Sequence, residues 1–404
     1  MAIAATRSKI GLALAGGGPV GGIYEVGALA ALSEAFEGAD FNAFDYYVGV
    51  SSGSFVAAAL ANGLRPATLA RMLVENDAEE VFEPERLLRL AFGEYCKRAQ
   101  SVPLLLWSSF CNYLSDPWHL GLFASFQSLG RALPAGIFDN SGIEEVLDKL
   151  FSTAGRSNDF RQIKHKLFLV ATDLDSGESL SFGEPGLDDV PISLAVQASS
   201  ALPGLFPPVK IGGHYFVDGA LIKTLHASIA LREGADLAIC INPLVPFDSK
   251  LAARQAPRDR RKRTLEHLVD GGLPVVLAQT FRAIIYSRMR IGMDRYRMEY
   301  PNADVLLFEP TRDDADMFFA NVFSYSNRVR VCEHAYQGTR GDLYCRRNQL
   351  APLLARHGIR LNVDVLEDRT RSLLSAQRQI DPALAVAALD SSLDELERWL
   401  AARA

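Results

Sequence analysis

One serine of this 404-residue chain has the glycine spacing that a catalytic nucleophile requires. Ser51 lies between Gly49 and Gly53, after the apolar run Tyr46–Val50 and before a run of small residues, Ser54–Asn62. A sharp strand-to-helix turn exposes a serine hydroxyl, and the two glycines leave space for the turn and for a substrate. The N-terminus of the following helix would stabilise negative charge that develops on the substrate. The pattern predicts that Ser51 is a nucleophile; the alternative is a serine that only caps a helix.

A cluster of glycines follows the first predicted strand, Lys9–Ala15. Consecutive glycines expose backbone N–H groups, so an oxyanion hole is predicted from Gly16, Gly17, Gly18 and Gly21. Three of these residues also satisfy the GxGxxG pattern of dinucleotide-binding loops, which keeps an oxidoreductase as an alternative. That alternative expects an acidic residue at the end of the second strand, where this chain has the serine turn instead.

Asp218 is the third candidate for chemistry, since it follows the predicted strand Tyr215–Val217. An Asp-Gly pair is often only a turn. A carboxylate at the end of a strand nevertheless lies where sites on parallel sheets collect, and it can accept a proton from a serine hydroxyl. His214 and His226 flank Asp218, so an esterase with a Ser-His-Asp triad stays an alternative.

The composition limits the classes of protein that fit. Hydrophobic residues make up 49% and charged residues 22%, as in ordinary globular proteins, and a net charge of −6 argues against nucleic acid as a partner. The five cysteines form no CxxC pair and no metal-ligand spacing, which predicts reduced thiols, no metal site and a cytoplasmic location. No secretory signal is evident, and no apolar run approaches the roughly 18 residues that span a bilayer. Peripheral contact with a membrane stays open.

Predicted strands alternate with predicted helices, among them one over Gly22–Phe36, which indicates an α/β fold with a largely parallel central sheet. We expect a catalytic domain over residues 8–245, an insertion or lid over 83–138, and a mostly helical region over 246–404 that packs on the core. Between Lys250 and Tyr300 the chain holds 12 Lys or Arg against 5 Asp or Glu. We interpret this basic stretch as a solvated or packed helix face; the alternative is contact with an anionic membrane through Arg282–Arg297.

Together the three motifs resemble those of the patatin-like phospholipase family. That family combines a glycine-rich oxyanion loop, a GxSxG serine and an aspartate in Asp-Gly-Gly/Ala, which here is Asp218-Gly219-Ala220. Residues 171–178 and 198–209 are similar to its connecting segments, and the likeness covers residues 9–243. There are two departures. Val20 stands where the family usually has Arg or Lys, and the segment from Leu221 to His226 lacks the Asn that the family often has.

The resemblance implies a three-layer α/β core with an inserted helical lid and a helical C-terminal region. It also implies a Ser51–Asp218 dyad without histidine, in which Asp218 takes the serine proton and the glycine loop binds the oxyanion. Such a reaction requires no metal and no organic cofactor. The implied substrate is a phospholipid or another acyl-ester lipid; a catalytically inactive lipid-binding scaffold is the alternative.

The insertion is rich in apolar side chains, above all in Leu104–Trp107 and Trp118–Phe123. Each methylene removed from water contributes about 0.8 kcal/mol, so an apolar lid would favour long acyl chains; a segment that only covers the core is the alternative. We expect Trp107→Ala or Trp118→Ala to weaken hydrolysis of long-chain esters in vesicles more than hydrolysis of a short nitrophenyl ester. Equal losses on the two substrates would indicate general destabilisation instead.

Overall fold

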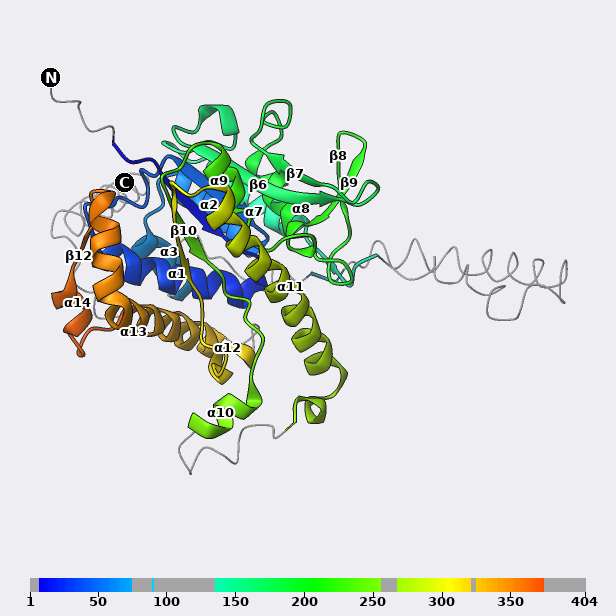
Figure 1. Cartoon of the computed structure of the whole chain (residues 1–404). Coiled ribbons are helices and arrows are strands. Elements are labelled where there is room, and N and C mark those ends of the chain that lie inside the picture. The colour runs from blue at the N-terminus through cyan, green and yellow to red at the C-terminus, as the bar shows by residue number, and fades with distance from the viewer. Residues whose placement is uncertain (1–6, 75–88, 91–134, 256–266, 321–324, 374–404) are drawn as a thin grey trace, which may run out of the picture.

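The computed structural model describes residues 7–74, 89–90, 135–255, 267–320 and 325–373. An eight-stranded sheet lies between two layers of helices (Figure 1). Its order is β11 (Asp304–Phe308), β10 (Leu237–Ile241), β1 (Ile10–Leu14), β3 (Tyr46–Val50), β6 (Lys166–Asp173), β9 (His214–Asp218) and β8 (Val209–Ile211), with β7 (Ser179–Phe182) also paired to β6. The predicted three-layer α/β core is confirmed.

Most of the sheet is parallel. The five strands from β11 to β6 run in one direction, whereas β7 and β9 are antiparallel to β6 and β8 is antiparallel to β9. The tight β8–β9 hairpin turns at Gly212 and Gly213, which both have positive φ. The prediction of a largely parallel sheet is confirmed, but the expectation that Asp218 ends a parallel strand is wrong, because this hairpin reverses the chain.

Both faces of the sheet are buried, since successive side chains of a strand point to opposite sides. Leu12 and Leu14 of β1 join the core on one face, and Ala13 and Ala15 join the core on the other. The first face is covered by α1 (Gly18–Ala35), α2 (Ser52–Ala61) and α8 (Ile192–Ser199), and the second by α9 (Ala227–Arg232) and α11 (Gly272–Glu299). Because both faces are covered, the parallel strands of this sheet have apolar side chains at successive positions.

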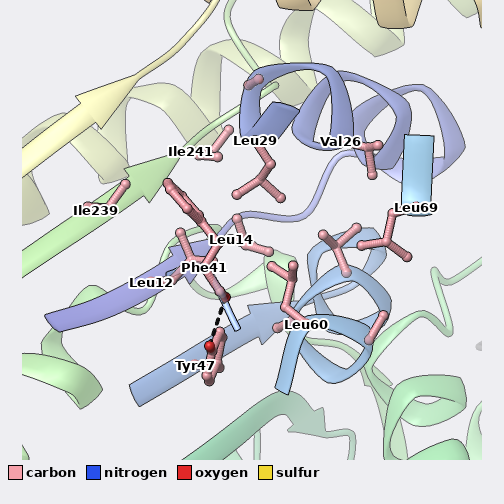
Figure 2. Close-up of a cluster of buried hydrophobic side chains, with 14 of the residues drawn as sticks. Leu12, Leu14, Val26, Leu29, Phe41, Tyr47, Leu60, Leu69, Ile239 and Ile241 are labelled. Carbon is pink, nitrogen blue, oxygen red and sulfur yellow. Dashed lines mark hydrogen bonds between the residues drawn. The ribbon is translucent and has the colours of Figure 1, made fainter. Parts of the chain in front are cut away.

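Helix α1 is apolar on nearly every side and lies inside the molecule. Figure 2 shows its Val26 and Leu29 in one cluster with Leu14 of β1, Leu60 of α2 and Leu69 of α3 (Pro66–Val74). Its neighbour α13 (Tyr325–Arg356) approaches closely at Gly27, where a Cβ atom would lie 2.3 Å from the carbonyl oxygen of Cys332. The helix begins four residues before the predicted start, because Gly18 adopts a left-handed φ of 61° and the glycine loop turns directly into the first helical turn.

Shorter elements complete the described chain. They are α3 (Pro66–Val74), α7 (Ser141–Phe151), α10 (Ser249–Gln255), α12 (Ala315–Phe318), α14 (Val363–Glu367), and the antiparallel pairs β2 (Phe36–Glu37) with β12 (Arg360–Leu361) and β4 (Arg89–Leu90) with β5 (Phe138–Asp139). The predicted lid over residues 83–138 lies outside the described residues except for 89–90 and 135–138. The leucines and tryptophans named for it all lie outside them.

Helix α11 and the short turn before it form one apolar segment, Leu268–Glu299. Within the described residues it alone is long and apolar enough to cross a membrane, judged by length and composition, with a mean hydropathy of 1.4 over its best 18 residues. The expectation that no segment qualifies is wrong. It rested on apolar runs, whereas this helix combines apolar stretches with isolated charged residues.

The buried carboxyl of Glu25 on α1 makes a testable prediction about stability. The side chain is fully buried, neither of its oxygens has a hydrogen-bond partner among the described residues, and burial raises its pKa well above the usual range. We expect Glu25→Met to raise the free energy of unfolding by about 1–3 kcal/mol at pH 7, measured by urea denaturation. Because the raised pKa means that the folded protein loses stability as pH rises above the unfolded value, the gain should shrink in acid.

A matched control is available on the same helix. Glu34 accepts a hydrogen bond from the Tyr336 hydroxyl (2.7 Å) and forms an ion pair with Arg371. Glu34→Met should therefore leave stability unchanged or lower it. A loss of stability in Glu25→Met at neutral pH would contradict the prediction.

Candidate active site

Ser51 occupies a strained turn between β3 and α2. Its φ of 53° is the one positive value of any non-glycine residue in the part of the chain that the structure describes. The backbone passes so close to its neighbours that side chains do not fit at the two motif glycines. A Cβ atom at Gly49 would lie 2.5 Å from the Gly53 carbonyl oxygen, and one at Gly53 would lie 2.7 Å from the Ala15 carbonyl oxygen. Both glycines are thus required by close packing of the turn.

Strand β6 brings the end of β9 to this turn. One edge of β6 pairs with β7 through residues 169–172. The opposite edge pairs with β3 as far as Val170, whose partner is Val50, and continues with β9 from Ala171, whose partner is Asp218. Strands β3 and β9 therefore meet end to end along one edge of β6. The residue after Val50 adjoins Asp218 for this reason.

The Asp218 carboxyl is buried beside the serine, with 3% of the residue exposed. It accepts a hydrogen bond from the Ala220 N–H (2.8 Å), and the Ser51 side chain lies beside it. Burial raises the pKa of Asp218 to about 6, and the interactions with Ser51 and the Ala220 N–H oppose that rise. A carboxylate with this pKa is a stronger base than an exposed aspartate and is mostly ionised at neutral pH.

The four glycines predicted for the oxyanion hole lie beside Ser51, but they are not equivalent. The Gly16 N–H donates to the Thr224 carbonyl (3.3 Å) and the Gly21 N–H donates to the Gly17 carbonyl within α1 (3.1 Å). The Gly17 N–H donates to the Ser52 hydroxyl (3.1 Å). Among the hydrogen bonds of the described residues, none uses the Gly18 N–H. All four glycines were predicted for the oxyanion hole, and in the structure the N–H groups of Gly16 and Gly21 are bonded to backbone carbonyl oxygens.

Two of these glycines are needed for space instead. A Cβ atom at Gly16 would lie 3.1 Å from the Ser51 Cβ, and one at Gly21 would lie 3.3 Å from the Ser52 hydroxyl. Gly219 has a similar role on the other side of the site, since a Cβ atom there would lie 2.3 Å from the Val170 carbonyl oxygen. Small residues let the chain after Asp218 cross the end of β6 toward Ser51.

A cavity of 330 Å³ opens over these residues. Ser51, Asp218 and the glycines 16–18 form part of its wall. Most of the remaining wall is apolar and comes from α2, α8, the loop after α8 and α11, with Phe55, Val196, Leu202, Leu205, Phe206 and Phe281. Two guanidinium groups, Arg282 and Arg328, also line it. The arrangement presents a serine and its carboxylate to a largely apolar ligand.

The histidines lie elsewhere. His214 contacts the Asp173 carboxylate (3.0 Å), and His226 is buried, which lowers its pKa to about 3. Within the described chain no histidine lines the cavity, and no group of three His, Cys, Asp or Glu side chains could hold a metal. One further histidine, His119, lies outside the described residues. The structure thus brings Ser51 and Asp218 together without bringing either flanking histidine to the serine.

The two departures from the family pattern fall at packed positions. Val20 on α1 packs partly buried against the core. Lys223, in the segment after Asp218, donates to the Ser228 hydroxyl (3.0 Å) and lies 4.9 Å from the Tyr296 ring centre of α11. Desolvation lowers the pKa of Lys223 to about 8. These contacts attach the segment after Asp218 to α11.

Comparison with known families agrees with this geometry. The sequence matches the patatin-like phospholipase family over residues 12–231, more than half of the chain. The chain belongs to this family. The matched range includes the glycine loop, Ser51 and Asp218.

Solved structures similar to this patatin-like phospholipase include VipD from Legionella pneumophila, with 15% identity, a TM-score of 0.37, and 83% of this chain and 66% of that chain covered. The type III effector ExoU of Pseudomonas aeruginosa has 14% identity and a TM-score of 0.34, with 84% and 53% covered. Human GIVD cytosolic phospholipase A2 has 13% identity and a TM-score of 0.31, with 83% and 58% covered. The chain therefore spans between half and two thirds of each of these structures.

Ser199 is a site residue that the motifs did not single out. The Ser51 N–H donates to the Ser199 hydroxyl (2.9 Å), which in turn donates to the Val170 carbonyl oxygen of β6 (2.6 Å). This bridge fixes the strained turn to the strand that aligns Asp218. Ser199 belongs to residues 198–209, the segment that is similar to a connecting segment of the family. The bridge gives this similarity a physical role.

We expect Ser199→Ala to reduce kcat at least tenfold, because the Ser51 turn loses the hydroxyl that accepts its N–H and the nucleophile shifts relative to Asp218. A steady-state assay with a soluble nitrophenyl ester would measure this. Ser193→Ala is the matched control: Ser193 is an equally buried serine of α8 that bonds Asn158 away from the cavity. Equal effects of the two variants on kcat would argue that Ser199 has only a structural role.

Proposed function

We propose that this patatin-like phospholipase is a serine lipid acyl hydrolase, a carboxylic ester hydrolase that uses Ser51 as nucleophile and Asp218 as base. One observation carries the proposal. Ser51, on a strained turn, lies beside the buried Asp218 carboxyl in the wall of a largely apolar cavity. Nucleophile, base and lipid-compatible cavity thus coincide.

The reaction follows from this arrangement in two steps. The Ser51 oxygen attacks the ester carbonyl while Asp218 takes its proton, and the tetrahedral intermediate then expels the alcohol, which receives the proton from Asp218. Asp218 next removes a proton from a water molecule, which attacks the acyl-serine. Collapse of the second intermediate releases the fatty acid and returns the proton to Ser51.

The oxyanion would lie against the start of α1. The Gly18 N–H is the candidate donor that the described hydrogen bonds leave available, and the Gly17 N–H joins it by exchanging its bond to the Ser52 hydroxyl for the oxyanion. The positive N-terminal ends of α1 and α2 favour the same charge. Backbone donors do not depend on the side chain at position 20, so Val20 is compatible with this role.

We propose a phospholipid as the preferred substrate class and peripheral contact with a membrane. Apolar side chains line most of the cavity and suit an acyl chain, while Arg282 and Arg328 suit a phosphate group. The proposed lid is the segment over residues 83–138, most of which lies outside the described residues. Its return end is bonded to the cavity wall, where the Phe138 N–H donates to the Leu205 carbonyl (2.8 Å). A cytoplasmic location is likewise a proposal, supported by the free thiols of Cys240, Cys332 and Cys345.

Ser51→Ala and Asp218→Asn test the dyad. Each should lower kcat/KM by at least about a thousandfold on a lipid ester while the protein stays folded, because one removes the nucleophile and the other the proton acceptor. For the wild type, kcat/KM should fall as pH drops below about 6, since protonated Asp218 cannot take the serine proton. Rates on a panel of phospholipids and neutral esters between pH 5 and 8 would measure both effects.

His214→Ala is the control, because His214 lies beside Asp218 in sequence but contacts Asp173. It should retain activity, and a fluorophosphonate should label the wild type but not Ser51→Ala. A histidine variant as inactive as Ser51→Ala would favour the Ser-His-Asp alternative. A wild type that neither hydrolyses esters nor reacts with the fluorophosphonate would favour the inactive scaffold.

A further inference from the structure

The first half of α11 exposes an unusual number of large apolar side chains. We define the docking face as Leu273, Val276, Leu277, Phe281 and Ile284, which are all exposed. Leu273 is 69% exposed and Leu277 is 58% exposed, so these leucines are not core residues of the described fold. Figure 1 shows this end of the helix running away from the sheet and its helical layers. An apolar face of this size needs a partner.

The second half of the same helix is firmly packed. Its Met289, Met293 and Tyr296 are buried against the sheet and the segment after β9, and Ile285 is buried as well. Arg288 also donates to the Ile222 carbonyl (3.3 Å), and the Tyr296 hydroxyl donates to the Leu225 carbonyl (3.4 Å). A helix held in this way cannot cross a bilayer without exposing that core. It can lie along a membrane surface with its free half.

The docking face is continuous with the cavity of the candidate active site. Phe281 belongs to both, and its neighbours Ala278 and Arg282 on α11 line the cavity as well. A lipid in contact with the docking face therefore lies at the apolar wall of the site. This continuity favours a lipid surface over other apolar partners.

The charge of α11 favours an anionic surface. The helix carries five arginines, at positions 282, 288, 290, 295 and 297, against two acidic residues, Asp294 and Glu299, a net charge of +3. The whole chain has a net charge of −6. A basic helix on an acidic protein orients the side of the molecule that carries α11 toward anionic headgroups.

We propose that the docking face of α11 rests on the surface of an anionic phospholipid bilayer and delivers lipid from that surface to the Ser51–Asp218 cavity. This inference rests on the proposed function. Exposed leucines and a phenylalanine insert among the headgroups, and the packed half of the helix holds the cavity mouth against the bilayer. The occupant is a lipid surface, not a second copy of the chain or a bilayer-spanning arrangement.

The experiment compares two double variants of the full chain. Leu273→Ser/Leu277→Ser removes two side chains of the docking face that do not line the cavity. Met298→Ser/Tyr344→Ser is the matched control: both residues are exposed, and Met298 lies on the same helix about 31 Å from Leu277. Co-sedimentation with phosphatidylcholine–phosphatidylglycerol vesicles measures binding, and a soluble nitrophenyl ester measures the dyad.

The docking-face variant should bind these vesicles at least tenfold more weakly than the wild type, with unchanged turnover of the soluble ester, and the control should bind normally. Wild-type binding should also weaken with added salt and on pure phosphatidylcholine vesicles. Undiminished vesicle binding by the docking-face variant would overturn the proposal and leave the dyad intact. A wild type that does not hydrolyse the soluble ester would instead overturn the proposed function.

Two further outcomes would also overturn the docking proposal. A wild-type dimer that the docking-face variant converts to a monomer, measured by light scattering, would assign the face to a second copy of the chain. A clear fall in melting temperature confined to the docking-face variant would assign it to a covering segment of the same chain.

Discussion

The left-handed backbone at Ser51 is the constraint on which the site depends. A non-glycine residue in this conformation costs of the order of 1–3 kcal/mol and persists only where its surroundings hold it. Here the Ser51 N–H bonds the Ser199 hydroxyl, and the Ser54 N–H bonds the Ser51 carbonyl. Gly49 and Gly53 admit the close backbone contacts. The strain is thus offset by the same packing that aims the hydroxyl at the cavity.

Strand β6 converts this local turn into a two-residue site. One edge of β6 carries both the end of β3 and the end of β9, so adjacent positions of one strand set the separation of serine and aspartate. The arrangement buries Asp218 and raises its pKa to about 6. Burial of Asp218 therefore lowers the stability of the fold but makes the carboxylate a stronger base. Shifted pKa values of this kind are common at catalytic sites.

Helix α11 connects the site to the molecular surface. Its packed half holds the segment after Asp218 through Arg288 and Tyr296, and Phe281 and Arg282 reach the cavity from the other side. A lipid surface at the docking face would therefore contact the same helix that holds the segment after Asp218. Helix α11 thus links exposed apolar side chains at the surface to the residues that position Asp218.

The sequence by itself determined the strands and helices around the site, because apolar runs, the GxSxG turn and glycine positions are local patterns. Strand β3, for example, matches its predicted bounds, and the α/β class follows from the alternation of elements. Only the tertiary structure decided that β9 runs antiparallel, that Ser199 holds the turn, and that the Gly16 and Gly21 N–H groups are already bonded. It also decided that half of α11 stays exposed. These features depend on which distant segments share an edge or a face, and residue spacing along the chain carries no information about that choice.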